Sequence, residues 1–144
     1  MDIRPILSER SIVNWSVTQQ KKRQDRWQKI AFSASCQSHR DTIPKIYPVQ
    51  SFSDFCSDTD FEDYDLLLAP WEESTLSSAL SSDQFLTPYK KIGVFIGPEG
   101  GITELEIELL KTKGFKDISL GNTVLRVEIA AVVLMSQLLC LNKK

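Results

Sequence analysis

One glycine-rich loop has residue types that suit the binding of a ligand. Its sequence is "GPEGG", residues 97–101, and it stands between the apolar run "KIGVFI" and a predicted helix. A phosphate-binding loop offers many backbone N–H groups and usually a lysine, but Pro98 has no N–H and the loop holds neither Lys nor Arg. Such glycines instead let the backbone approach a flat, uncharged group such as an adenine ring, and Glu99 favours a ligand with positive charge. The alternative is a tight turn that binds nothing.

A second stretch, "LGNTVLRVEIA" at residues 120–130, also leads from a predicted strand into a helix. Loops that follow parallel strands meet at one edge of a sheet, which is where α/β proteins bind ligands. The two loops can therefore share one pocket. Arg126 and Glu128 open the helix, and an ion pair at the helix start is the structural alternative to a chemical role for them.

The elements around these loops predict an α/β fold with a mainly parallel sheet, because helix and strand signals alternate along the chain. Apolar runs predict strands at 65–70, 91–97 and 115–121, and the first of these is expected to be buried on both faces. Helices are predicted at 21–39, from the capping box of Thr103 and Glu106 to Lys113, and at 126–141. Ser51 and Asp54 predict a weaker cap, and 77–89 predicts a short helix and a loop.

Composition predicts one globular domain with a core, since the chain has 144 residues, 42% of them hydrophobic, and a net charge of −2. This charge argues against a protein that coats nucleic acid by bulk electrostatics. A basic cluster within 21–29 is either a solvated helix face or an RNA contact, and the first interpretation is favoured. The only histidine, His39, is predicted at a polar helix end, where it is structural or faces RNA.

Cysteine spacing and hydropathy bear on the compartment. Cys36, Cys56 and Cys140 have no CxxC spacing, so buried reduced thiols are expected rather than a disulfide or a metal site. The sequence shows no charged start followed by the apolar core of a signal peptide, and the apolar run at 129–141 is too short for a membrane span. We expect a cytoplasmic protein without a membrane partner.

Three motifs, "IGPEGGITELE", "GFKDISLG" and "VLRVEIAA", together resemble the carboxyl-terminal motifs of the SPOUT methyltransferases, most closely the RsmE type. "ERS", "RWQKI" and "QSHRDTIPKI" upstream are similar to the same family. The resemblance runs from about Ser8 to Leu139 in the expected order. It implies methylation of a uridine at N3 in 16S ribosomal RNA, in the assembled small subunit.

The resemblance also implies a parallel α/β sheet flanked by helices with a carboxyl-terminal deep trefoil knot, an exception to the rule that chains do not knot. Residues 21–144 would be the SPOUT methyltransferase domain and 1–20 a leader or linker remnant. The family is dimeric, which would cover the apolar helix at 126–141. The implied S-adenosylmethionine pocket is formed by Leu68, Ala69, Pro70, Ile96, Gly97, Pro98, Glu99, Gly100, Gly101, Leu120, Gly121 and Leu125, and the implied RNA contacts by Arg23, Arg26, His39 and Arg40.

Uridine N3 keeps its proton at neutral pH, so methylation requires a group that stabilises the developing anion. Arg126 can hold charge on the uracil carbonyl oxygens, although a guanidinium cannot act as the base. Glu128 is the nearest candidate base, or it orients Arg126. No metal is expected.

Three features differ from the family pattern. Val127 and Ile129 replace two threonines, Thr123 replaces an arginine, and the family's amino-terminal PUA-like barrel has no counterpart in the sequence. The alternatives are therefore a cofactor-binding knot dimer without independent RNA methylation, serving as a fragment or interaction module, and a SPOUT enzyme that acts on another RNA.

Overall fold

A computed structural model describes residues 1–74 and 89–142 of the chain, and the expected short helix and loop at 77–89 lie almost wholly outside them. Contacts divide the chain into two compact units. The first unit comprises Met1–Ser8 and Ile12–Ser57. The second comprises Glu9–Ser11 and Asp58–Lys144.

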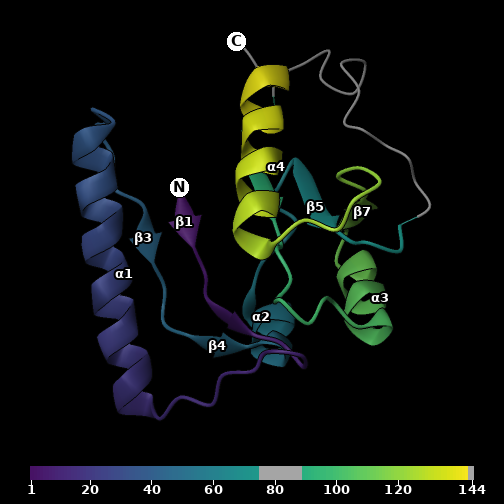
Figure 1. The fold of residues 1–144 in the computed structure, drawn as a ribbon, viewed down its shortest axis with the longest axis horizontal. Helices are drawn as coiled ribbons and strands as arrows, with labels where there is room; N and C mark the ends of the chain where they lie inside the picture. The colour runs from purple at the N-terminus through teal and green to yellow at the C-terminus, as the bar shows by residue number, and fades with distance from the viewer. Residues whose placement is uncertain (75–88, 143–144) are drawn as a thin grey trace. The chain divides into compact units, whose positions relative to one another are not determined.

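The first unit consists of helix α1 (Val17–Gln37) with short parallel strands. β1 (Asp2–Ile3) pairs with β3 (Lys45–Ile46), and β2 (Ile6–Leu7) pairs with β4 (Gln50–Ser51). Figure 1 shows β3 beside α1. The Gln28 side chain joins them, because its Nε2 donates to the Pro44 carbonyl at 2.9 Å and its Oε1 accepts from the Ile46 N–H at 3.0 Å.

Helix α1 begins earlier than the sequence analysis predicted. Ser16 and Gln19 form a capping box, in which the Gln19 N–H donates to Ser16 Oγ and the Ser16 N–H donates to Gln19 Oε1. Helix α2 (Phe52–Asp58) has the expected cap, since the Asp54 N–H donates to Ser51 Oγ at 3.0 Å. Each cap satisfies a backbone donor that the helix itself leaves unpaired.

The second unit holds a parallel sheet in the order β6-β5-β7. The central strand β5 (Leu66–Pro70) pairs with β6 (Ile92–Val94) through its first half and with β7 (Lys116–Ile118) through its second. Residues Leu66–Ala69 are all buried, as expected for a parallel strand that is covered on both faces. The predicted parallel sheet flanked by helices is confirmed, and the trefoil knot stays a prediction.

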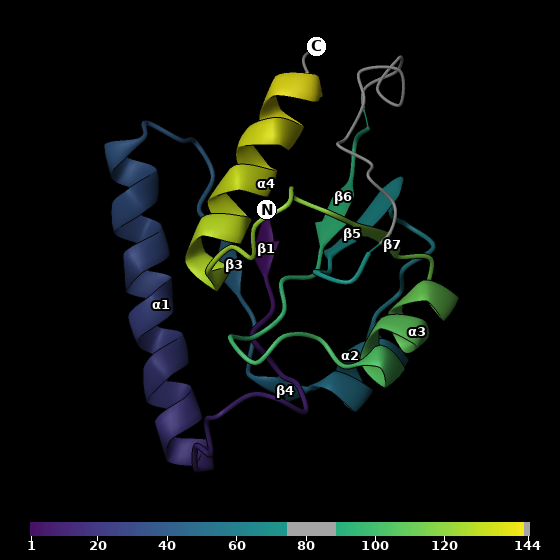
Figure 2. The same cartoon turned by 45° about the vertical axis from the view of Figure 1, so that its right-hand side comes forward.

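Two helices flank this sheet, and Figure 2 shows α3 (Glu104–Thr112) and α4 (Val127–Leu141) on different sides of the strands. Leu134 and Leu138 of α4 are buried in one cluster with Leu66, Leu68 and Ile118. The rest of α4 is more open than a buried helix would be. Ile129, Val132 and Leu139 are 46%, 64% and 64% exposed, so a part of its apolar surface faces outward.

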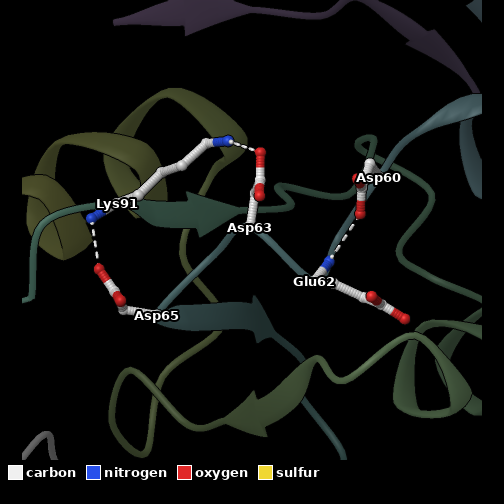
Figure 3. A network of polar contacts seen from close by, with 5 residues as sticks. All are labelled: Asp60, Glu62, Asp63, Asp65 and Lys91. Atoms are coloured by element: carbon white, nitrogen blue, oxygen red, sulfur yellow. Dashed lines mark hydrogen bonds and ion pairs between the residues drawn. The ribbon is translucent and has the colours of Figure 1, made fainter.

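A polar network fixes the amino ends of β5 and β6 (Figure 3). The Asp65 carboxylate accepts from the backbone N–H groups of residues 91 and 90, both at 2.8 Å, and these bonds hold the pKa of Asp65 below its usual value. Lys91 Nζ forms an ion pair with Asp63 Oδ2 at 3.5 Å. In the preceding turn, the Glu62 N–H donates to Asp60 Oδ1 at 3.0 Å. The network joins the amino ends of β5 and β6, and the other end of β6 leads into the 97–101 loop.

The expectation that all three cysteines are buried is wrong for two of them. All three carry free thiols, but only Cys56 is buried, whereas Cys36 and Cys140 are exposed. Both exposed residues lie near helix ends, where apolar neighbours in sequence do not decide which face a residue takes. Within residues 1–74 and 89–142, no helix has the length and apolar character needed to cross a membrane.

Candidate active site

A pocket lies at the carboxyl ends of the three strands of the second unit. Each strand contributes the residues at its end, and α4 contributes its first turns. This is the edge at which parallel α/β sheets bind ligands. The lining residues are Pro70, Trp71, Glu72, Ile96, Gly97, Pro98, Gly101, Ile102, Ser119, Leu120, Gly121, Asn122, Thr123, Val124, Leu125, Val127 and Ala130.

The glycine-rich loop forms one wall of this pocket, and its glycines are needed for different reasons. A Cβ on Gly97 would lie 2.5 Å from Ile102 Cγ1, so no larger residue fits there unless the loop shifts. Gly101 has a φ of +78°, a left-handed conformation that favours glycine, and its N–H donates to the Pro98 carbonyl at 2.9 Å. The tight turn and the pocket wall are therefore the same feature.

The loop after β7 forms the facing part of the lining. Gly121 has a φ of +126°, and no described atom lies within 4 Å of the position that a Cβ would take. Ser119 holds the turn, because its Oγ donates to the Gly121 carbonyl at 3.1 Å and accepts from the Gly121 N–H at 3.3 Å. A side chain at Gly121 would thus meet backbone strain rather than a steric clash.

Of the twelve residues predicted to hold a cofactor, eight line the pocket. These are Pro70, Ile96, Gly97, Pro98, Gly101, Leu120, Gly121 and Leu125. The side chains of Leu68 and Ala69 belong to the core instead. Glu99 and Gly100 are exposed at the outer side of the loop, so the carboxylate in the wall belongs to Glu72 rather than to Glu99.

The sequence analysis missed the part of the wall that each loop adds beyond its predicted residues. Trp71 and Glu72 directly follow the predicted end of β5, Ser119 lies within the predicted strand 115–121, and Asn122 and Thr123 belong to the predicted loop at 120–130. The signal that could have found them is the strand-end rule itself, applied to the whole loop instead of to the matched motif.

The start of α3 is held by a segment from near the beginning of the chain. Thr103 and Glu106 form the predicted capping box, with the Thr103 N–H donating to Glu106 Oε2 at 3.1 Å and the Glu106 N–H donating to Thr103 Oγ1 at 3.2 Å. The other carboxylate oxygen, Oε1, accepts from the Glu9 N–H at 2.9 Å. Glu106 is only 5% exposed, and the described backbone donors account for both of its oxygens.

Arg126 and Glu128 are both exposed, and neither is among the residues that line the pocket. Arg126 is the N-cap residue of α4, and its chain neighbours Leu125 and Val127 line the pocket. Both residues are described, and no ion pair joins them, so the structural alternative for this pair finds no support. An unpaired arginine at this position is available to a ligand.

The four residues predicted to contact RNA lie in the first unit and are exposed. Arg23 stacks on Trp15 with its Cζ 4.4 Å from the ring centroid, and Trp15 in turn packs on Trp27 at 5.9 Å. Arg40 Nη1 lies 3.8 Å from Met1 Sδ, and His39 has a φ of +51° just beyond the end of α1. Arg26, the fourth residue, is exposed on α1.

Charge is unevenly divided along the chain. The first unit has eight basic residues and four acidic ones, although the whole chain has a net charge of −2. The basic residues are Arg4, Lys21, Lys22, Arg23, Arg26, Lys29, Arg40 and Lys45, and the acidic ones are Asp2, Asp25, Asp41 and Asp54. A unit with an excess of positive charge attracts a polyanion such as a nucleic acid.

Comparison with known proteins places the chain in a family. Residues 1–139 match the model of the RNA methyltransferase domain, so the chain belongs to this family. Within it, the chain is similar to ribosomal RNA small subunit methyltransferase E, which confirms the RsmE-type resemblance. The Bacillus subtilis protein is 32% identical over 136 residues, which are 92% of this chain and 52% of that protein. The Synechocystis protein is 32% identical over 141 residues, 93% of this chain and 43% of that protein.

Solved structures agree with the fold. Ribosomal RNA small subunit methyltransferase E from Neisseria gonorrhoeae, bound to S-adenosylmethionine, has a TM-score of 0.75 and 31% identity, and the match covers 94% of this chain and 54% of that one. Lpg2936 from Legionella pneumophila, in complex with the same cofactor, has a TM-score of 0.83 and 28% identity, covering 95% and 54%. The chain thus spans about half the length of the relatives that it matches.

Proposed function

We propose that this chain binds S-adenosylmethionine in the strand-end pocket and methylates N3 of a uridine in 16S ribosomal RNA. The observation that carries the proposal is the convergence of all three strand-end loops on one pocket, in a chain of the RNA methyltransferase domain family. Two solved relatives bind this cofactor.

The pocket suits this cofactor in two respects. Its glycines bring backbone groups close to the ligand, which fits recognition of an adenine edge by main-chain donors and acceptors. The Glu72 carboxylate in the wall suits a ligand that carries positive charge. S-adenosylmethionine supplies a methyl group on a positively charged sulfur. The four predicted residues that do not line the pocket would then support its loops; these are Leu68, Ala69, Glu99 and Gly100.

Arg126 is proposed to stabilise the uracil anion. Its exposed position at the start of α4, beside two lining residues, leaves the guanidinium free to reach a base at the pocket mouth. A guanidinium keeps its proton and offers several donors, so it can hold charge that develops on carbonyl oxygens as N3 loses its proton. Glu128, also exposed, is proposed as the base or as the group that orients Arg126.

The RNA itself is proposed to contact the first unit through Arg23, Arg26, His39 and Arg40. The basic excess of that unit supports this proposal, because neutralised phosphates release counterions and so favour binding. The natural substrate is proposed to be the assembled small subunit in the cytoplasm. RNA affinity should then fall steeply between about 50 and 200 mM salt.

We also propose a homodimer that buries the outward apolar surface of α4. Ile129, Val132, Met135 and Leu139 recur along one side of that helix and are all exposed. Apolar side chains at such spacing favour a partner surface over water. Replacement of Val132 by Asp should convert a dimer into monomers in sedimentation, whereas a wild-type chain that is monomeric at micromolar concentration contradicts the proposal.

The function is tested by methyl transfer to small subunits from a strain that lacks this methylation. Wild-type protein and the Arg126→Ala variant are compared with radiolabelled S-adenosylmethionine, and the product nucleoside is identified. Arg126→Ala should lose transfer by at least about a hundredfold, the scale of one lost oxyanion donor, with cofactor affinity little changed. An active variant would place the anion stabiliser elsewhere.

Gly121→Val tests whether this pocket binds the cofactor. Its φ of +126° is costly for a β-branched residue, while the open space around it spares the core. Cofactor binding should disappear in calorimetry with the fold retained, and unchanged affinity contradicts the pocket assignment.

The rival function is a cofactor-binding dimer without RNA methylation. Val127 in the pocket wall favours it, since an apolar side chain there cannot order Arg126 by a hydroxyl. Cofactor binding without transfer to any ribosomal RNA would support this rival, and transfer to a different RNA would support the other alternative.

A further inference from the structure

One short segment of the chain contacts both the glycine-rich loop and the start of the helix that follows it. Glu9–Ser11 belongs by its contacts to the second unit, although the residues on either side of it belong to the first. Arg10 Nη1 donates to the Gly100 carbonyl at 3.1 Å. The Glu9 N–H donates to Glu106 Oε1 at 2.9 Å, at the helix start into which the loop runs.

The contact between Arg10 and the loop is close as well as polar. A Cβ on Gly100 would lie 2.9 Å from Arg10 Cβ and 3.0 Å from the Arg10 carbonyl oxygen, so the two backbones touch. Arg10 Nη1 lies 3.6 Å from the corresponding position on Gly101, where Glu72 Oε1 lies at 3.2 Å. Gly101 and Glu72 both line the pocket. Arg10 therefore contacts Gly100, which does not line the pocket, and lies close to Gly101, which does.

A loop with three glycines loses more conformational freedom on ordering than other sequences do. Within it, the bond from the Gly101 N–H to the Pro98 carbonyl closes the turn. A hydrogen bond from a guanidinium is stronger than a bond between neutral groups and acts here across 90 residues of sequence. Such a contact orders the loop before the ligand arrives, so that binding costs less entropy.

We infer that Arg10 is a positioning residue, whose guanidinium holds the 97–101 loop in the shape that forms the pocket wall. The effect on the loop follows from these contacts alone, and the effect on ligand affinity rests on the proposed function.

The first arm of the test measures the loop without any ligand, by amide hydrogen exchange in the full chain. Arg10→Ala should raise the exchange of the Gly101 and Thr103 amides about tenfold, the equivalent of one lost hydrogen bond. The amides of Phe95 and Trp71, which bond to the Leu68 and Ile118 carbonyls, serve as core references and should not change. Unchanged loop amides, or an equal rise in loop and core, would overturn the inference.

Two variants make this arm specific. Arg10→Lys keeps the charge and one donor and should lie between wild type and Arg10→Ala. Arg4→Ala removes an arginine that stacks on Tyr47 in the first unit, at 4.3 Å, and should leave the loop amides at wild-type rates. Loop amides that respond equally to the loss of either arginine would indicate a general charge effect and would also overturn the inference.

The second arm titrates S-adenosylmethionine by calorimetry. Arg10→Ala should weaken binding about tenfold with unchanged stoichiometry, since stoichiometry reports the folded fraction and affinity reports the loop. Normal affinity in Arg10→Ala refutes the role in binding. A wild-type chain that binds no cofactor refutes the proposed function instead, while the exchange arm still decides the inference.

Discussion

Replacement of Glu106 by Ala is expected to destabilise the second unit more than any other single change at the start of α3. The Glu106 carboxylate is buried and accepts the backbone N–H groups of Glu9 at 2.9 Å and Thr103 at 3.1 Å. Alanine would remove both acceptors and break a capping box. A hydrogen bond to a charged group contributes about 1.5–3 kcal/mol and a cap about 0.5–2 kcal/mol. Because these contributions overlap, we expect a loss of about 2–4 kcal/mol.

The measurement is thermal unfolding, followed by circular dichroism and by amide exchange within α3. For a chain of this size the expected loss corresponds to a midpoint lower by roughly 6–12 °C. Glu106→Gln should lose about half as much, since its amide offers one acceptor oxygen but turns an N–H₂ group toward the other donor.

Glu104→Ala is the matched control, because Glu104 carries the same charge in the same helical turn and is exposed. It should lose only the favourable interaction with the helix dipole, about 0.5 kcal/mol. If Glu106→Ala and Glu104→Ala unfold at the same midpoint, the buried carboxylate does not hold the two segments together and the reasoning is refuted.

Three further predictions use other contacts. Gly97→Ala should weaken S-adenosylmethionine binding at least about tenfold, because its Cβ would lie 2.5 Å from Ile102 Cγ1, and normal affinity in calorimetry contradicts this. Leu134→Ala should cost about 2–5 kcal/mol in urea unfolding, since Leu134 is fully buried in the sheet core, and a cost below 1 kcal/mol contradicts that packing. Because the fold lowers the pKa of Asp65, its carboxylate stabilises the folded state at pH values above the unfolded pKa of about 4, and this contribution is lost as the pH falls through the folded pKa. Asp65→Asn should therefore make the unfolding midpoint depend less on pH in the acid range. If the unfolding midpoint of Asp65→Asn depends on pH as it does in the wild type, other carboxylates cause the acid sensitivity and this prediction is contradicted.

The elements of the second unit were predictable because their signals are local. Four consecutive buried residues in β5, the box of Thr103 and Glu106, and the glycines at both loops can each be recognised within a window of about ten residues. The capping box of Ser16 and Gln19 is a local signal of the same kind, and it could have predicted the observed start of α1.

The sequence by itself determined the alternation of strands and helices and the two loops that line the pocket, because these depend on residues close together in the chain. Only the tertiary structure decided that Glu9 and Arg10 hold a loop and a helix more than 80 residues away, and that Cys36 and Cys140 are exposed. It also decided that the carboxylate in the pocket wall belongs to Glu72 rather than to Glu99. The physical reason is that propensity and periodicity report which backbone conformation a segment prefers, whereas the partner of a side chain depends on how distant segments pack.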